Sequence, residues 1–281
     1  MKIDHFITAI ILLVVFYVLF YIGKRFHDLL HREYDLTEEL VEKDNPAIAL
    51  AVVGYYLGMV FAIGGTLVGP STGIVDDILD LCIYGALSIV LLNISWFICD
   101  KIMLYRFKIV DELIRDRNQG TGVVSCGVSI ASGIIIFGSV SGEGGTIWTA
   151  TGFWALGQII LILAVFLYTW ITPYNVHDEI EKDNVAAGVS LAGAIVAMGI
   201  IIGMSAEGNF ESWSEALPDF FLVSFMGLLL LPVVRYLTDK VLLPTVTLAD
   251  EIANQETPNL GAAYIEAFSY IAASLVISWC V

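Results

Sequence analysis

Basic residues are scarce in this chain. Only 13 of its 281 residues are Lys or Arg, against 29 Asp or Glu, and the formal net charge is -16. An acidic chain of this kind lacks the basic surface that neutralises phosphates, so we expect no nucleic-acid partner. Charged residues of both signs make up only 15% of the chain. That share is too small to cover the surface of an ordinary soluble domain.

Catalytic and metal-binding motifs are also missing. The chain has no G-x-S-x-G, no H-E-x-x-H and no phosphate-binding loop, and its four cysteines show no C-x-x-C spacing. His27 and His31 are four residues apart, but no clear third ligand accompanies them. We place these histidines on an amphipathic segment at the lipid headgroups and expect no metal there. The sequence therefore predicts neither an enzyme nor a bound cofactor.

Long apolar runs dominate the chain instead. Apolar residues make up 58% of it and the mean hydropathy is +0.82, values typical of a polytopic membrane protein. A membrane-spanning helix needs about 20 mostly apolar residues. Eight runs meet that length: 5–23, 46–67, 79–99, 121–140, 147–171, 185–206, 217–237 and 259–281. We predict an all-α bundle of eight transmembrane helices in a lipid bilayer.

The loops between these spans differ in charge. Twelve of the 13 basic residues follow the first, third, fifth and seventh spans, whereas the loops near 68–78, 141–146 and 207–216 contain none. By the positive-inside rule the basic loops are cytoplasmic and both termini lie outside. The outer loops are almost purely acidic. They form either a solvated rim or a vestibule that attracts cations.

The chain contains an internal repeat. The segment Glu-Lys-Asp-Asn at 42–45 recurs at 181–184, an offset of 139. The same offset relates Gly54 to Gly193, Asp80 to Asp219, Asp100-Lys101 to Asp239-Lys240, Asp111-Glu112 to Asp250-Glu251, and Gly122 to Gly261. We infer a duplication with boundaries at 1–145 and 146–281. Because each half has an even number of spans, the two four-span repeats are parallel.

These repeated motifs carry a family resemblance. The Asp-Asn before a glycine-rich span, the Asp-Lys pair and the Asp-Glu pair before the next span resemble the bacterial membrane family called domain of unknown function 350. The resemblance covers almost the whole chain, as two fused copies of a four-span unit. It implies a bacterial inner-membrane protein with an accessory or transport role, and some family members occur with cytoplasmic ATP-grasp or glutathionylspermidine-synthase-like enzymes. The second copy differs in having few basic residues, which puts in doubt any contact of that half with anionic lipid or a partner.

Small residues at helical spacing mark two equivalent spans. They include Gly54 and Gly58 in the second span and Gly193, Gly199 and Gly203 in the sixth. Small residues let helix backbones approach closely in lipid. We expect these two helices to form the core of the bundle or the interface of a homo-oligomer.

Two acidic pairs lie where equivalent spans begin. Asp76 and Asp80 lie at the start of the third span, and Glu215 and Asp219 lie at the start of the seventh. The four-residue spacing places each pair on one helical face near the positive end of the helix dipole. The pairs either cap their helices or bind a hard cation, or a polyamine by charge alone, at an outer entrance.

Glu266 is an acidic residue inside the last span, where the first half has Gly127. A carboxylate at that depth is costly unless it is protonated, paired or hydrated. No Lys or Arg is expected deep enough to pair with it. Glu266 is therefore either a proton or cation site or a hydrogen-bonded structural carboxyl. Asn93 and Pro232 occupy equivalent places in the third and seventh spans, where they line a cavity or mark a bend.

Two functions are consistent with this pattern. The favoured hypothesis is a permeation or transport element for a small cation, with Glu266 inside and the acidic pairs at the outer mouth. The alternative is a membrane scaffold that recruits a cytoplasmic protein partner. Its contact residues would be Asp111, Glu112, Asp250 and Glu251.

Overall fold

The computed structural model describes residues 2–69, 71 and 73–280, and within those ranges it contains helices and loops but no strand. Among these described residues, eight helices are long and apolar enough to cross a membrane. They are α1 (Lys2–Leu30), α2 (Pro46–Gly64), α3 (Ile74–Ile98), α5 (Gln119–Val140), α6 (Ile147–Ile171), α8 (Val185–Ala206), α9 (Trp213–Leu237) and α11 (Leu260–Cys280). The prediction of an all-α membrane protein with eight spans is confirmed.

Short helical segments lie between the long ones. They are η1 (Glu38–Glu42), η2 (Gly65–Leu67), η3 (Cys99–Met103), α4 (Ile109–Ile114), α7 (Val176–Glu181), η4 (Thr238–Leu242) and α10 (Leu248–Ala253). The π-helical turns η3 and η4 continue α3 and α9, so these two spans run over Ile74–Met103 and Trp213–Leu242. Both are longer than the predicted 79–99 and 217–237, because hydropathy alone does not register polar turns that extend a helix.

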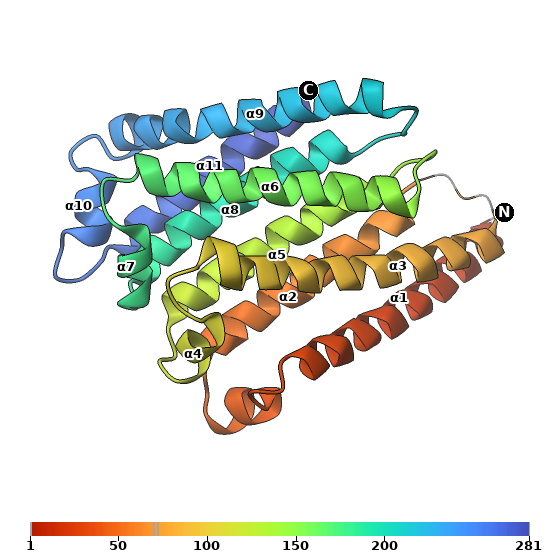
Figure 1. Cartoon of the computed structure of the whole chain (residues 1–281), viewed down its shortest axis with the longest axis horizontal. Coiled ribbons are helices and arrows are strands. Elements are labelled where there is room, and N and C mark those ends of the chain that lie inside the picture. The colour runs from red at the N-terminus through yellow and green to blue at the C-terminus, as the bar shows by residue number, and fades with distance from the viewer. Residues whose placement is uncertain (1, 70, 72, 281) are drawn as a thin grey trace.

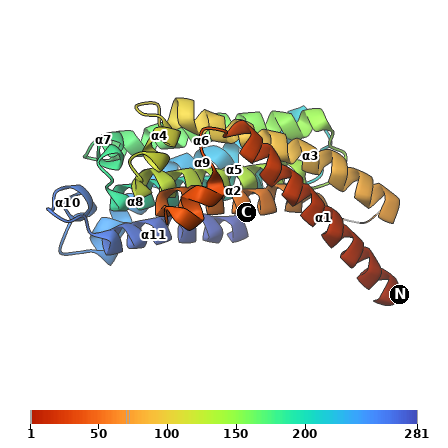
Figure 2. The same cartoon turned by 90° about the horizontal axis from the view of Figure 1, so that it is seen from below.

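The long helices form two rows, as Figure 1 shows. The row α2, α5, α8 and α11 lies behind, with consecutive members packed against one another, and α1, α3, α6 and α9 cross in front. Each front helix connects through a short helix to the back-row helix that follows it in the chain. Figure 2 shows that α1 diverges from the bundle toward its N-terminus. We call the end that carries η1, α4, α7 and α10 the basic face, and the opposite end, where α1 begins, the terminal face.

Glycines allow the back row to pack backbone to backbone. A Cβ on Gly54 would lie 2.2 Å from the Cα of Cys126, and one on Gly193 would lie 2.4 Å from the Cα of Ala267. Gly58, Gly199 and Gly203 make equally close approaches to Ser129, Ala131 and Ile134, respectively. Dispersion contacts over such close crossings replace the hydrophobic drive that lipid cannot supply.

The duplication is visible in the helix boundaries. The offset of 139 relates the starts of α2 and α8, both ends of α3 and α9, and the bounds of η3 and η4 and of α4 and α10. It changes to 141 at α5 and α11, because the last loop is two residues longer in the second half. Their N-terminal caps are Asn118 and Asn259. The predicted match of Gly122 to Gly261 is therefore wrong: Gly120 matches Gly261, and Ser125, not Gly127, matches Glu266.

The back row ends at α11. On α5, Gly127 and Gly138 permit contact with α8, where a Cβ would lie 2.8 Å from Ala192 and 1.8 Å from Gly203 O, respectively. The matching positions on α11 are Phe268 and Trp279, which are 63% and 77% exposed. These aromatic side chains prevent a further helix from packing in the same way. The predicted homo-oligomer would therefore need another surface.

Candidate functional site

Glu266 is the most deeply buried acidic residue, and it has a basic partner. Its Oε1 lies 2.5 Å from Nη1 of Arg235, and the two side chains are 0% and 8% exposed. The expectation that no Lys or Arg reaches this depth is wrong. Arg235 was counted with the loop after the seventh span, but α9 runs past it into η4 and places its side chain against α11. The ion pair offsets the cost of burying either charge alone.

Two tyrosines, Tyr168 and Tyr270, lie beside this ion pair. The Tyr168 hydroxyl lies 3.5 Å from Glu266 Oε1, and the Arg235 guanidinium lies 5.7 Å from the centre of the Tyr168 ring. Tyr270 packs edge-on against Tyr168, and both are buried. A cavity bordered by Tyr270 measures only about 10 Å³, about the room one water needs. Glu266 thus already has a protein partner; that it binds a proton or cation stays a prediction.

The first half holds a neutral cluster at the corresponding depth. His27 Nδ1 donates to Asn93 Oδ1 at 3.3 Å, and Asn93 Nδ2 donates to the Tyr55 hydroxyl at 2.9 Å. The His31 ring lies 4.1 Å from that of Trp96. Both histidines are buried, so their predicted place on a separate amphipathic helix after the first span is wrong: α1 continues to Leu30 and turns them toward α3. Within the described ranges no three His, Cys, Asp or Glu side chains gather to hold a metal.

The duplication relates these two clusters. By the offset of 139, Asn93 corresponds to Pro232 and Trp96 to Arg235. The second half therefore has Arg235 of the ion pair where the first half has the indole of Trp96, while the position of Glu266 is occupied by Ser125. Sequence reasoning found Asn93 but missed Tyr55, Trp96 and Arg235, because their roles depend on helices that lie far apart in the chain.

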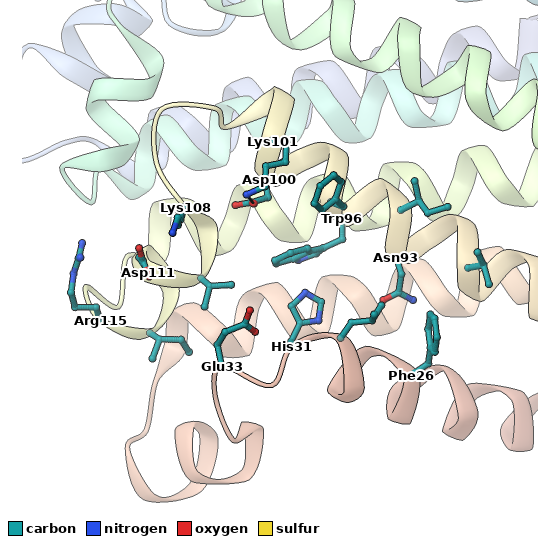
Figure 3. Close-up of a pocket in the computed structure, with 16 residues that line it drawn as sticks. Phe26, His31, Glu33, Asn93, Trp96, Asp100, Lys101, Lys108, Asp111 and Arg115 are labelled. Carbon is teal, nitrogen blue, oxygen red and sulfur yellow. Dashed lines mark ion pairs between the residues drawn. The ribbon is translucent and has the colours of Figure 1, made fainter.

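A pocket opens beside the neutral cluster on the basic face, as Figure 3 shows. Its volume is about 780 Å³, within the usual range for small-molecule sites. His31 and Glu33 approach it from the end of α1, Trp96 and Asp100 from α3 and η3, and Lys108, Asp111 and Arg115 from around α4. The pocket therefore combines three basic and three acidic side chains, counting Lys101, with an aromatic wall.

A second pocket, of about 560 Å³, lies on the terminal face. Asp77, Asp80 and Glu143 line it together with Ser and Thr hydroxyls, and Thr8 and Leu12 of α1 form one wall. Asp76 is exposed on the first turn of α3, outside this pocket. Glu215 and Asp219 lie near the start of α9 and line none of the pockets found in the described ranges. Of the four residues in the two predicted acidic pairs, only Asp80 lines one of these pockets in the described part of the chain.

The predicted cytoplasmic-contact residues divide into exposed and inward-facing ones. Glu112 is buried and accepts a hydrogen bond from Asn118 Nδ2 at 2.8 Å, and Glu251 accepts one from Asn259 Nδ2 at 2.6 Å. Asp111 and Asp250 are exposed. The side chains of Thr247 and Asn254 donate to Asp250 and hold its pKa below the ordinary value. Of these four residues, only the two aspartates are exposed.

The asparagines that begin the back-row helices also link neighbouring short helices. Asn45, Asn118 and Asn184 each cap their own helix and donate Nδ2 to a backbone carbonyl of the next short helix, at Leu113, Ile180 and Ile252. These bonds are 2.6–2.8 Å long, and all three side chains are buried. The short helices on the basic face are thus fixed in one line.

Comparison with known proteins agrees with the division of the chain into two halves. A family model described as Domain of Unknown Function (DUF350) matches residues 1–140 and again residues 144–281. A protein of Aquifex aeolicus (strain VF5) named UPF0719 transmembrane protein is 24% identical over 275 residues, which cover 94% of this chain and 96% of the relative. No solved structure matches. The resemblance predicted from the sequence is confirmed.

Proposed function

The chain belongs to the DUF350 family of multi-pass transmembrane proteins, and from this premise we propose that it is a transport element for a small cation. The observation that supports the proposal is that the two large pockets lie at opposite ends of one helix pair, α1 and α3. Carboxylates line both pockets. Cations are drawn to anionic, partly enclosed surfaces of this kind.

The terminal-face pocket provides the outer site of the proposed pathway. Asp80 and Glu143 form no ion pair with any residue whose placement is described, so their charge is available to a cation. The hydroxyl of Ser71 donates to Asp77 at 2.5 Å. Carboxylate and hydroxyl oxygens are suitable ligands for hard cations.

An apolar layer closes the α1–α3 interface between the pockets. A Cβ on Gly85 would lie 2.8 Å from the side chain of Leu19, and one on Gly23 would lie 3.2 Å from Ile89 Cγ1. Between this layer and the basic-face pocket, His27 is hydrogen-bonded to Asn93, and Asn93 lines the pocket. Among the α1 side chains from Phe6 to Leu30, only Leu19 and His27 are buried. We propose that a small displacement of this weakly held helix opens the layer.

Glu266 lies outside this interface, between α9 and α11. The proposed pathway therefore assigns the outer site to Asp80 and its neighbours. Glu266 stabilises the second half through Arg235. This differs from the arrangement expected from the sequence, which placed Glu266 inside the pathway.

Flux through reconstituted liposomes tests the proposal. Vesicles with the wild-type protein, a K⁺, Na⁺ or Mg²⁺ gradient and an internal indicator should show flux of at least one ion. The double variant Asp80→Asn, Glu143→Gln should reduce it by about tenfold, because two ligands of one site are neutralised. The matched control is Glu215→Gln, Asp219→Asn, at the second-half positions without a pocket. Equal flux in the two double variants would contradict the pathway.

The line of short helices supports a second candidate, a scaffold for a soluble protein. η1, α4, α7 and α10 are joined by the asparagine bonds into one rigid surface, and Asp111 and Asp250 project from it. Under this alternative, Asp111→Asn, Asp250→Asn would abolish recovery of a cytoplasmic partner in pull-downs while the protein remains folded. Recovery of the same partners with the variant would contradict it.

A further inference from the structure

The charges in the basic-face pocket are unevenly paired. Lys101 pairs with Asp100 at 2.5 Å, and Arg115 pairs with Asp116 outside the pocket. Lys108, Glu33 and Asp111 have no ion-pair partner within the described part of the chain. The pocket thus presents one unpaired positive charge and two unpaired negative charges to whatever fills it. A ligand that carries both signs would satisfy them best.

His31 adds a directed acceptor to the same pocket. Its side chain is over nine-tenths buried, and its Nδ1 lies 2.9 Å from the backbone oxygen of His27. A carbonyl oxygen only accepts, so Nδ1 must carry the proton. In the neutral ring Nε2 is then an acceptor, and it has no hydrogen-bond partner among the described residues. Burial lowers the pKa of His31 and favours this neutral form.

Part of the pocket lining is apolar and is exposed on the outside of the bundle. Phe26, Leu30, Val90, Ile94 and Phe97 line the pocket. Of these, Leu30, Val90 and Phe97 are 50%, 44% and 58% exposed. They belong to membrane-spanning helices, so their exposed surface faces acyl chains. The pocket therefore joins the hydrocarbon region to the charged basic face.

We propose that this pocket binds one phospholipid with a zwitterionic, amine-bearing headgroup. The phosphate lies at Lys108 and the ammonium lies among Glu33, Asp111 and His31, which together offer carboxylates and a free imidazole nitrogen. The acyl chain follows Ile94 and Phe97 into the bilayer. A headgroup with negative charge alone would leave Glu33 and Asp111 without a partner. The inference does not depend on cation transport.

Lipid binding to the purified full-length protein tests this site. Short-chain phosphatidylethanolamine and phosphatidylglycerol are titrated separately, and bound lipid is counted by native mass spectrometry. Lys108→Ala should weaken both lipids by about tenfold, because both carry the phosphate. Glu33→Gln should weaken only phosphatidylethanolamine. Lys182→Ala, which removes an exposed Lys of the same face that does not line the pocket, is the control and should change neither.

Each outcome either supports or contradicts the proposed lipid site. The site is supported if Lys108→Ala weakens both lipids and Glu33→Gln weakens only phosphatidylethanolamine. The elution volume and the melting temperature should be unchanged in both variants. Tighter wild-type binding of phosphatidylglycerol than of phosphatidylethanolamine, or equal loss of both lipids in Glu33→Gln, overturns the zwitterionic assignment. Wild-type affinity in both variants overturns the site itself. Because no flux is measured, failure of the transport proposal leaves this test unaffected.

Discussion

Arg235 of α9 and Glu266 of α11 form an ion pair that is closed to solvent, with 2.5 Å between Nη1 and Oε1. Removing one member leaves the other charge uncompensated in a membrane interior. The stability of the second half is therefore sensitive to the loss of either charge alone. The first half has a neutral histidine cluster and lacks this sensitivity.

Loss of Arg235 is therefore expected to be costly. Arg235→Leu should lower the free energy of unfolding by about 3–5 kcal/mol, as breaking a buried pair does. Arg235→Leu combined with Glu266→Leu should recover most of that loss, because no charge remains buried. Denaturant unfolding in detergent, followed by circular dichroism, measures both. A double variant no more stable than Arg235→Leu would show that the pair is not the source of the cost.

Backbone contact in the back row gives a second prediction. Gly54→Val places methyl groups into the backbone of Cys126 and should destabilise the fold by about 1–3 kcal/mol or more. The control is Gly64→Val in the same helix, where a Cβ meets nothing within 4 Å. Melting temperatures in detergent compare the two. Similar values would mean that α2 and α5 are not in backbone contact.

The buried carboxyl of Glu112 predicts a pH dependence. Burial raises its pKa above the ordinary value of 4.5, so the folded chain retains a proton that the unfolded chain releases. Its contribution to stability is fully present below 4.5 and is lost as the pH rises through the raised pKa. Glu112→Gln should therefore melt at a temperature that falls less than that of the wild type between about pH 4 and about pH 7. Parallel curves for the two proteins would contradict this.

Orientation can be tested with a cysteine already present. Cys280 is exposed at the end of α11. The charge distribution of the loops predicts that this end lies outside, so a membrane-impermeant maleimide should label Cys280 in intact cells with their outer membrane permeabilised. In a background with Cys82 and Cys280 replaced by Ser, Lys108→Cys, on the basic face, should react only after the inner membrane is opened. The reverse pattern would invert the topology.

Hydropathy and the repeat predicted the helix number and the duplication because lipid imposes both length and apolarity on every span. The same reasoning failed for residues whose role depends on helix rotation. Arg235 was counted as a loop charge and His27 as a surface side chain, yet both point inward, toward Glu266 and Asn93. Nothing in the local pattern around Arg235 reveals a partner that lies 31 residues away.

The register of the last helix was missed for a different reason. Constant spacing held over most of the chain, so the same offset was carried into α11. The actual start is set by Asn259, whose side chain caps α11 and reaches back to Glu251. The N-terminal cap at Asn259 determines where α11 begins. The apparent match of Gly122 to Gly261 does not.

A reversible lock across the apolar layer tests the proposed pathway most directly. Leu19→Cys and Gly85→Cys, in a background with Cys82 and Cys280 replaced by Ser, place two thiols where α1 and α3 touch. Oxidation to the disulfide should abolish cation flux in liposomes, and reduction should restore it, because α1 must move for the layer to open. Undiminished flux through fully cross-linked protein would contradict the account.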